Sequence, residues 1–107
     1  MTIHIQNLTF DTIIGILDFE RTTPQKVIVD IDIEYEFDDE FIDYSIITKL
    51  IQDSMNEHKF LLIEDALLSL KDTIVSKYPQ IKSLDIKITK PQILSNCSVG
   101  VSNFWKF

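Results

Sequence analysis

The clearest alternation of apolar and charged residues in this sequence is QKVIVDIDIEYEF, residues 25–37. Alternate residues of a β-strand point to the same side of a sheet. From Val27 onward, one face of this segment would carry apolar side chains, those of Val27, Val29, Ile31, Ile33, Tyr35 and Phe37. Most of the residues between them are charged, so the pattern predicts a strand with one buried and one solvated face, as in antiparallel sheets.

The flanking sequence predicts three more strands and two helices. A first strand is expected over residues 2–10, with a bulge near Gln6 and Asn7 where the apolar phase changes. Residues 44–58 and 63–77 carry apolar residues at helical spacing, and two last strands are expected over 83–90 and 97–105. Within the first helix the apolar stripe comprises Ile46, Ile47, Leu50, Ile51 and Met55.

The resulting order β-β-α-α-β-β predicts a single α+β domain over residues 1–107. Two helices would cover one face of a four-stranded antiparallel sheet. An open sheet of this kind leaves unpaired backbone groups at both edges, which oligomerisation would cover.

Composition narrows the classes of partner. The chain has 107 residues, of which 45% are hydrophobic, enough to supply one core. Seventeen acidic against ten basic residues give a formal charge of −7, which opposes binding to nucleic acid. There is no apolar run of about 18 residues and no signal region after Met1, so we expect a cytoplasmic protein with no membrane partner.

The sequence contains no motif that predicts a metal site or an internal disulfide. Cys97 is the only cysteine and cannot form an internal disulfide, and no Cys/His cluster has metal-ligand spacing. Two alternatives stay open: a metal site formed in space by His4 or His58 with scattered carboxylates, and a cation site in the acidic segment 30–40 in place of a solvated face.

Lys90 occupies the apolar phase of the strand predicted over 83–90. Leu84, Ile86 and Ile88 precede it at alternate positions. A desolvated lysine has a lowered pKa and suits proton transfer near neutral pH. The alternative is that the strand has ended before Pro91 and that the lysine stem snorkels to water.

Three other residues are candidates for chemistry, each with an ordinary structural explanation. Glu20 follows Gly15 in a long connection and is typical of a solvated carboxylate. Glu64 borders the apolar stripe of the second helix. It is either a first-turn carboxylate that the helix dipole stabilises, or a carboxylate held in an apolar pocket to bind an N–H pair. Tyr44, at the start of the first helix, offers a phenol that can donate and accept a proton. The alternative is that its ring only packs against neighbouring apolar side chains.

The order of these motifs resembles that of the dihydroneopterin aldolase family of folate biosynthesis. The segments that carry the resemblance are IGILDFE (14–20), QKVIVD (25–30), DY (43–44), LLIE (61–64), ITKP (88–91) and VGV (99–101). The resemblance spans essentially the whole chain. It implies a tunnelling fold, in which four subunits close their sheets into a barrel and two such rings commonly stack into an octamer.

The same resemblance implies a reaction. The substrate would be 7,8-dihydroneopterin, cleaved to 6-hydroxymethyl-7,8-dihydropterin and glycolaldehyde by a retro-aldol step with no cofactor, metal or Schiff base. The dihydropterin ring itself accepts the electrons released on cleavage. Proton movement is then the only catalysis that the protein must supply.

Residue by residue, the resemblance assigns Lys90 to remove the side-chain hydroxyl proton through a water and Tyr44 to help reprotonate the intermediate. Glu20 matches a loop glutamate near that water and lysine. Glu64 matches the glutamate that anchors the pterin amino group, with backbone and packing contacts from Leu62 and Ile63. The Tyr44 region would come from a neighbouring subunit, so that Ile42 and Asp43 also line the site.

The loop 92–98 is more compact and less proline-rich than in many members of the family, which leaves its substrate contacts undefined.

Two alternative functions stay open. A dihydroneopterin triphosphate epimerase shares the fold and much of the site. A noncatalytic acidic interaction module would account for segment 30–40, but leaves the spacing of Glu20, Tyr44, Glu64 and Lys90 unexplained.

Overall fold

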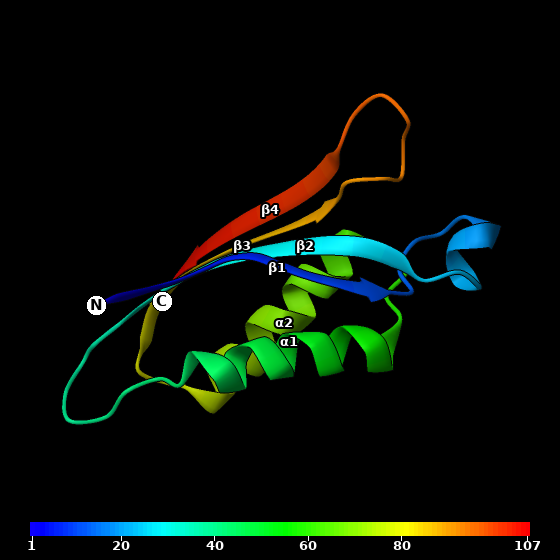
Figure 1. The fold of residues 1–107 in the computed structure, drawn as a ribbon. Helices are drawn as coiled ribbons and strands as arrows, with labels where there is room; N and C mark the ends of the chain where they lie inside the picture. The colour runs from blue at the N-terminus through cyan, green and yellow to red at the C-terminus, as the bar shows by residue number, and fades with distance from the viewer.

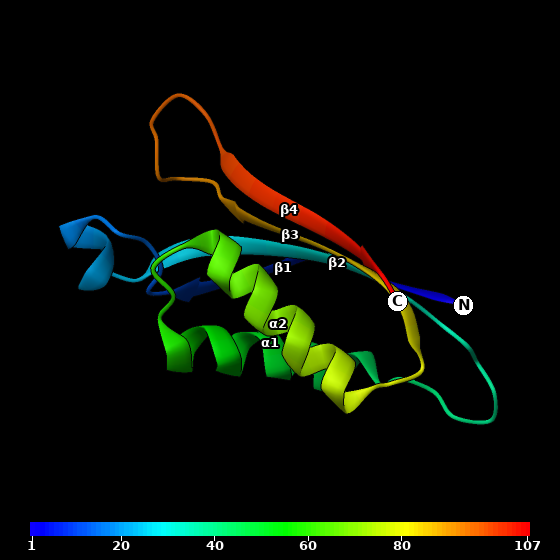
Figure 2. The same cartoon turned by 180° about the vertical axis from the view of Figure 1, so that it is seen from behind.

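The computed structural model describes all 107 residues and contains the predicted elements in the predicted order. They are β1 (Thr2–Thr12), β2 (Gln25–Tyr35), α1 (Tyr44–His58), α2 (Ile63–Lys77), β3 (Ile81–Lys90) and β4 (Val99–Lys106). A short 3₁₀ helix that was not predicted, η1 (Asp18–Arg21), lies in the connection between β1 and β2. The strands form one sheet in the order β1-β2-β3-β4, and every neighbouring pair is antiparallel. Both helices cover the same face of it (Figures 1 and 2). The predicted α+β fold is confirmed.

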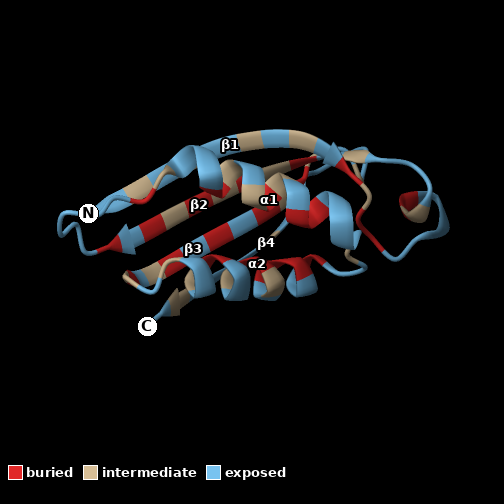
Figure 3. Cartoon of the chain, turned by 90° about the horizontal axis from the view of Figure 1, so that it is seen from below, coloured by how far each residue is buried: buried red, intermediate tan, exposed pale blue.

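The core lies between the helices and the two central strands. The alternate residues of β2 and β3 that face the helices are almost fully buried, as Figure 3 shows by the red bands along both strands. They are Val27, Val29, Ile31, Ile33, Leu84, Ile86 and Ile88. Each removes a large apolar surface from water, and this burial drives the helices onto the sheet.

Local chemistry sets the helix boundaries. The Asp43 carboxylate accepts a hydrogen bond from the Ser45 amide at 2.9 Å and caps α1. Lys59 ends α1 in the left-handed conformation, with φ 49°. The apolar stripe is buried through Ile47, Ile51 and Met55, whereas Ile46 is 42% exposed and lies outside it, because it is turned 100° from Ile47.

Strand boundaries differ slightly from the prediction. β2 ends at Tyr35, where the pairing with β3 shifts register, so Phe37 lies in the connection to α1 and is 54% exposed. β4 begins at Val99 rather than Cys97, since Lys90 and Val99 are the last pair between β3 and β4. The bulge in β1 is confirmed, with Asn7 at φ 60° between the paired residues Ile5 and Leu8.

The elongated sheet has two distinct ends (Figure 1). One, which we call the η1 end, gathers the connections 13–24, 59–62 and 91–98. The other, the opposite end, holds the connections 36–43 and 78–80 together with both chain termini. No helix is long and apolar enough to cross a membrane.

Candidate active site

Lys90 and Glu20 form a buried ion pair at the η1 end. The Lys90 Nζ atom lies 2.8 Å from Glu20 Oε2, although 70 residues separate them in sequence. Lys90 is 8% exposed and Glu20 3%. The lysine therefore follows Ile88 into the interior as its strand phase predicts, and the snorkelling alternative is wrong. The expectation of a solvated Glu20 is also wrong, because η1 turns this side chain inward to the lysine.

Two further donors fix the Glu20 carboxylate. Gln25 Nε2 donates to Oε2 at 2.8 Å, and the Leu17 amide donates to Oε1 at 3.2 Å. Burial raises the pKa of this carboxyl, but the hydrogen bonds from Lys90, Gln25 and Leu17 and the positive charge of Lys90 lower it by more. The net effect holds the pKa of Glu20 below its ordinary 4.5, so the group is a carboxylate at neutral pH.

This arrangement suits proton transfer. An ammonium has three N–H donors, and Lys90 uses one of them on Glu20. The other two positions on Nζ can hold a water or a substrate hydroxyl, so that a proton can pass between that oxygen and the lysine. A buried, opposite-charged pair at the end of a strand is therefore a candidate acid–base centre.

The lowered pKa of Glu20 predicts a specific pH dependence of stability. A carboxyl whose pKa is lower in the folded than in the unfolded state stabilises the fold above the unfolded value, and this contribution is lost as pH falls through the folded value. We expect the difference in unfolding free energy between the wild type and Glu20→Gln to be constant near neutral pH and to shrink below about pH 4.5. Urea denaturation from pH 7 to about pH 3 measures it; a difference that does not change with pH would contradict the pairing.

Gly15 leaves room for the Glu20 carboxylate. Its φ is +129°, and a Cβ atom placed there would overlap the carboxyl group of Glu20. Any side chain at position 15 must therefore displace the carboxylate as well as adopt a conformation that L residues avoid.

We expect Gly15→Ala to cost about 1–3 kcal/mol of stability and to weaken the ion pair. The matched control is Gly100→Ala, because a Cβ there would lie 3.0 Å from Thr89 Oγ1 and 3.3 Å from Lys87 Cε, a tight contact but no overlap, and the backbone at Gly100 is not in the positive-φ region. Urea denaturation of both variants checks the comparison. Equal losses at the two glycines would show that Gly15 has no special relation to Glu20.

Sequence reasoning missed two residues of this end. Gln25 also donates to the Ile14 carbonyl at 2.8 Å, and Arg21 contacts three backbone carbonyls of the surrounding loops. The signal for Gln25 was available: it is a polar residue in the same strand phase as Val27, just as Lys90 is in phase with Ile88. Arg21 was detectable only as the single arginine of the chain.

Glu64 also lies at the η1 end, in the first turn of α2. Ile63 beside it is buried, but Glu64 is exposed and Leu62 is 43% exposed. The predicted apolar pocket around Glu64 is therefore not formed by this chain alone. The physical reason is helical geometry, since the buried stripe runs through Ile63 and Leu67 and turns Glu64 about 100° away from it.

Tyr44, Asp43 and Ile42 lie at the opposite end. Ile42 is buried, Asp43 caps α1, and Tyr44 is 65% exposed. The 15 residues of α1, at about 1.5 Å each, separate Tyr44 from the η1 end by roughly 22 Å. One chain thus brings Lys90 and Glu20 into contact and Glu64 to the same end, but it does not bring Tyr44 to them.

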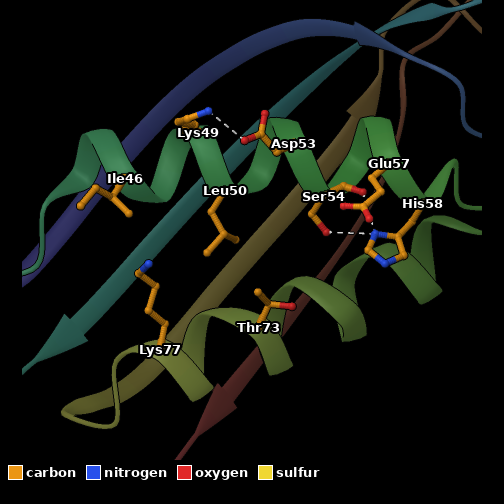
Figure 4. A pocket seen from close by; sticks show the side chains of 9 residues that line it. All are labelled: Ile46, Lys49, Leu50, Asp53, Ser54, Glu57, His58, Thr73 and Lys77. Atoms are coloured by element: carbon orange, nitrogen blue, oxygen red, sulfur yellow. Dashed lines mark hydrogen bonds and ion pairs between the residues drawn. The ribbon is translucent and has the colours of Figure 1, made fainter.

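The one cavity within the chain lies elsewhere. A groove of about 460 Å³ runs between α1 and α2 and is lined by Leu50, Ser54, His58, Thr73 and others (Figure 4). It contains none of the predicted site residues. No three His, Cys, Asp or Glu side chains cluster as they would around a metal ion.

Comparison with known proteins adds the family context. The family model for dihydroneopterin aldolase matches residues 3–103. A curated dihydroneopterin aldolase of Haemophilus influenzae is 31% identical over 108 residues, which cover 92% of this chain and 91% of that protein.

Solved structures agree in fold. The Escherichia coli dihydroneopterin aldolase in complex with neopterin has a TM-score of 0.88 at 21% identity, over 98% of both chains. A Burkholderia dihydroneopterin aldolase bound to guanine has a TM-score of 0.81 at 15% identity, over 100% of this chain and 91% of that one. At these identities the structures show likeness of fold alone, and they confirm the subunit architecture of the tunnelling fold that the sequence resemblance implied.

Proposed function

This chain belongs to the dihydroneopterin aldolase family, and we propose from that premise that it cleaves 7,8-dihydroneopterin with the Lys90–Glu20 pair as its proton-transfer centre. The products are 6-hydroxymethyl-7,8-dihydropterin and glycolaldehyde. The observation that carries the proposal is the 2.8 Å contact between two buried, oppositely charged groups at the residues that the family resemblance singled out.

In the proposed reaction Lys90 acts at the side-chain hydroxyl of the substrate. The hydroxyl proton passes through a water to the Nζ of Lys90, and the oxygen forms the carbonyl of glycolaldehyde as the carbon–carbon bond breaks. The electron pair of that bond moves into the dihydropterin ring, and the carbon is then reprotonated with the help of Tyr44. Glu20 orients Nζ through the 2.8 Å contact, and the proton taken up at Lys90 is released again as Tyr44 delivers one to the carbon, so that the cycle gains and loses no proton.

Glu64 is proposed to anchor the pterin ring. A carboxylate can accept two parallel N–H bonds, and the amino group and neighbouring ring N–H of a pterin present such a pair. Leu61 and Leu62, immediately before α2, are 55% and 43% exposed and offer apolar surface to the flat ring. Since Glu64 is open to solvent in one chain, the rest of the pocket is proposed to come from a second copy.

A homo-oligomer follows from the separation of the two ends. Tyr44 can act with Lys90 only if the opposite end of one subunit meets the η1 end of another. The free edges of β1 and β4 offer the backbone groups for such an assembly. We propose a ring of subunits with the sheets joined edge to edge, with each site formed between neighbours.

A substrate assay tests the proposal. Purified protein is incubated separately with 7,8-dihydroneopterin and with its triphosphate, and the pterin products and glycolaldehyde are measured. Glycolaldehyde release from 7,8-dihydroneopterin is the expected result. Isomerisation without cleavage would indicate an epimerase in place of an aldolase. If neither substrate reacted, both proposed enzymatic activities would be refuted.

A further inference from the structure

Arg21 is the only arginine of the chain, and its contacts differ from those of a surface charge. It follows Glu20 in η1 but forms no ion pair. Its guanidinium donates instead to three backbone carbonyl oxygens: Nη1 to those of Gly15 at 3.0 Å and Phe60 at 3.3 Å, and Nη2 to that of Lys59 at 2.8 Å.

These three carbonyls belong to two segments that carry different parts of the proposed site. Gly15 lies in the connection that presents Glu20 to Lys90. Lys59 and Phe60 lie in the linker that leads from α1 into α2, four to five residues before Glu64. The two segments also touch directly, since the Gly15 amide donates to the Phe60 carbonyl at 3.1 Å.

The chemistry of this contact favours a guanidinium over an ammonium. Carbonyl groups just past the end of a helix have no partners in its hydrogen-bond ladder, and the negative end of the helix dipole favours a cation there. A guanidinium has five N–H donors in one fixed plane and can hold several carbonyls together, whereas the ammonium of lysine is a point charge on a flexible stem.

We propose that Arg21 is a positioning residue that fixes the spacing between the Lys90–Glu20 pair and Glu64. Arg21 itself touches no reacting atom. It holds the linker before α2 against the Glu20 loop, so that a pterin anchored at Glu64 places its side chain within reach of Lys90. The inference rests on the proposed aldolase function.

The test compares Arg21→Ala and Arg21→Lys with the wild type and with Lys26→Ala, an exposed cation at the start of β2 that forms no ion pair. We expect Arg21→Ala to lower kcat about 10- to 100-fold, with a smaller rise in KM, because misplacement by about 1 Å can cost a hundredfold in rate. Arg21→Lys should lie between Arg21→Ala and the wild type, and Lys26→Ala should match the wild type.

Chemical rescue separates positioning from a general loss of stability. Methylguanidinium, at a concentration that does not denature the wild type, should restore part of the kcat of Arg21→Ala and leave Lys26→Ala unchanged. Unchanged kinetics in Arg21→Ala, or a loss of activity that follows only the unfolded fraction and is not rescued, would overturn the inference.

Hydrogen exchange distinguishes a failure of this inference from a failure of the proposed function. The Gly15 amide should exchange faster in Arg21→Ala than in the wild type, whether or not the protein is an aldolase. A wild type that releases no glycolaldehyde would refute the function. Unchanged exchange at Gly15 would refute the clamp between the two segments.

Discussion

Replacing Lys90 with methionine should lower kcat by about 10²- to 10⁴-fold, the range that a positioned acid–base group contributes, while pterin affinity changes little. The side chain moves a proton and does not anchor the ring, so its loss acts on the chemical step. Steady-state rates of glycolaldehyde release and equilibrium binding of a pterin measure the two effects separately. The matched control is Lys87→Met, on the exposed face of the same strand, which should retain activity.

Lys90→Met should also lower the stability of the fold, because it breaks the ion pair with Glu20. Methionine leaves the Glu20 carboxylate buried without its cation, which costs about 3–5 kcal/mol in comparable pairs. The double variant Lys90→Met/Glu20→Gln removes both charges and should recover much of that stability without recovering activity. If activity returned together with stability, Lys90 would be a structural and not a catalytic residue.

In contrast to Lys90→Met, Glu64→Ala should reduce pterin binding. Loss of two hydrogen bonds to a charged acceptor should weaken pterin binding by about 10²- to 10⁴-fold, since each such bond is worth roughly 1.5–3 kcal/mol. The neighbouring exposed carboxylate, changed in Asp65→Ala, should have little effect on binding. Similar small effects from Lys90→Met and Glu64→Ala would contradict the division of roles between proton transfer and anchoring.

Strand phase explains why part of this site was predictable from the sequence. Lys90 interrupts an apolar face at a position where burial is forced by its neighbours, and the structure confirms it. The same logic applies to Gln25, in phase with Val27, although a glutamine at the start of a strand is not by itself a signal of function. Periodicity is therefore informative wherever a polar residue occupies the buried phase of a regular element.

The remaining features depend on contacts that no local pattern contains. The burial of Glu20 results from an irregular loop that meets a strand 70 residues further on, and the sequence around Glu20 is that of a solvated turn. The exposure of Phe37 follows from a register shift between β2 and β3. The distance between Tyr44 and Lys90 follows from the direction of α1, which appears only once the helix is packed on the sheet.

That distance leads to the second large effect. We expect two inactive variants, Lys90→Met and Tyr44→Phe, to regain activity when their subunits are mixed by co-expression or by dissociation and reassociation. Each site would take Lys90 from the η1 end of one subunit and Tyr44 from the opposite end of its neighbour. With random assortment in a 1:1 mixture, about a quarter of the sites combine both intact residues, so recovery should approach a quarter of wild-type activity.

The control for mixing comes from the same geometry. Lys90 and Glu20 contact each other within one chain, so no mixture of Lys90→Met with Glu20→Gln can form a site with both residues intact. That mixture should stay as inactive as its components, and glycolaldehyde release measures both mixtures. Recovery in neither mixture would contradict a site shared between subunits. Recovery in both would mean that the pair itself is exchanged between chains, which the 2.8 Å contact within a single chain does not allow.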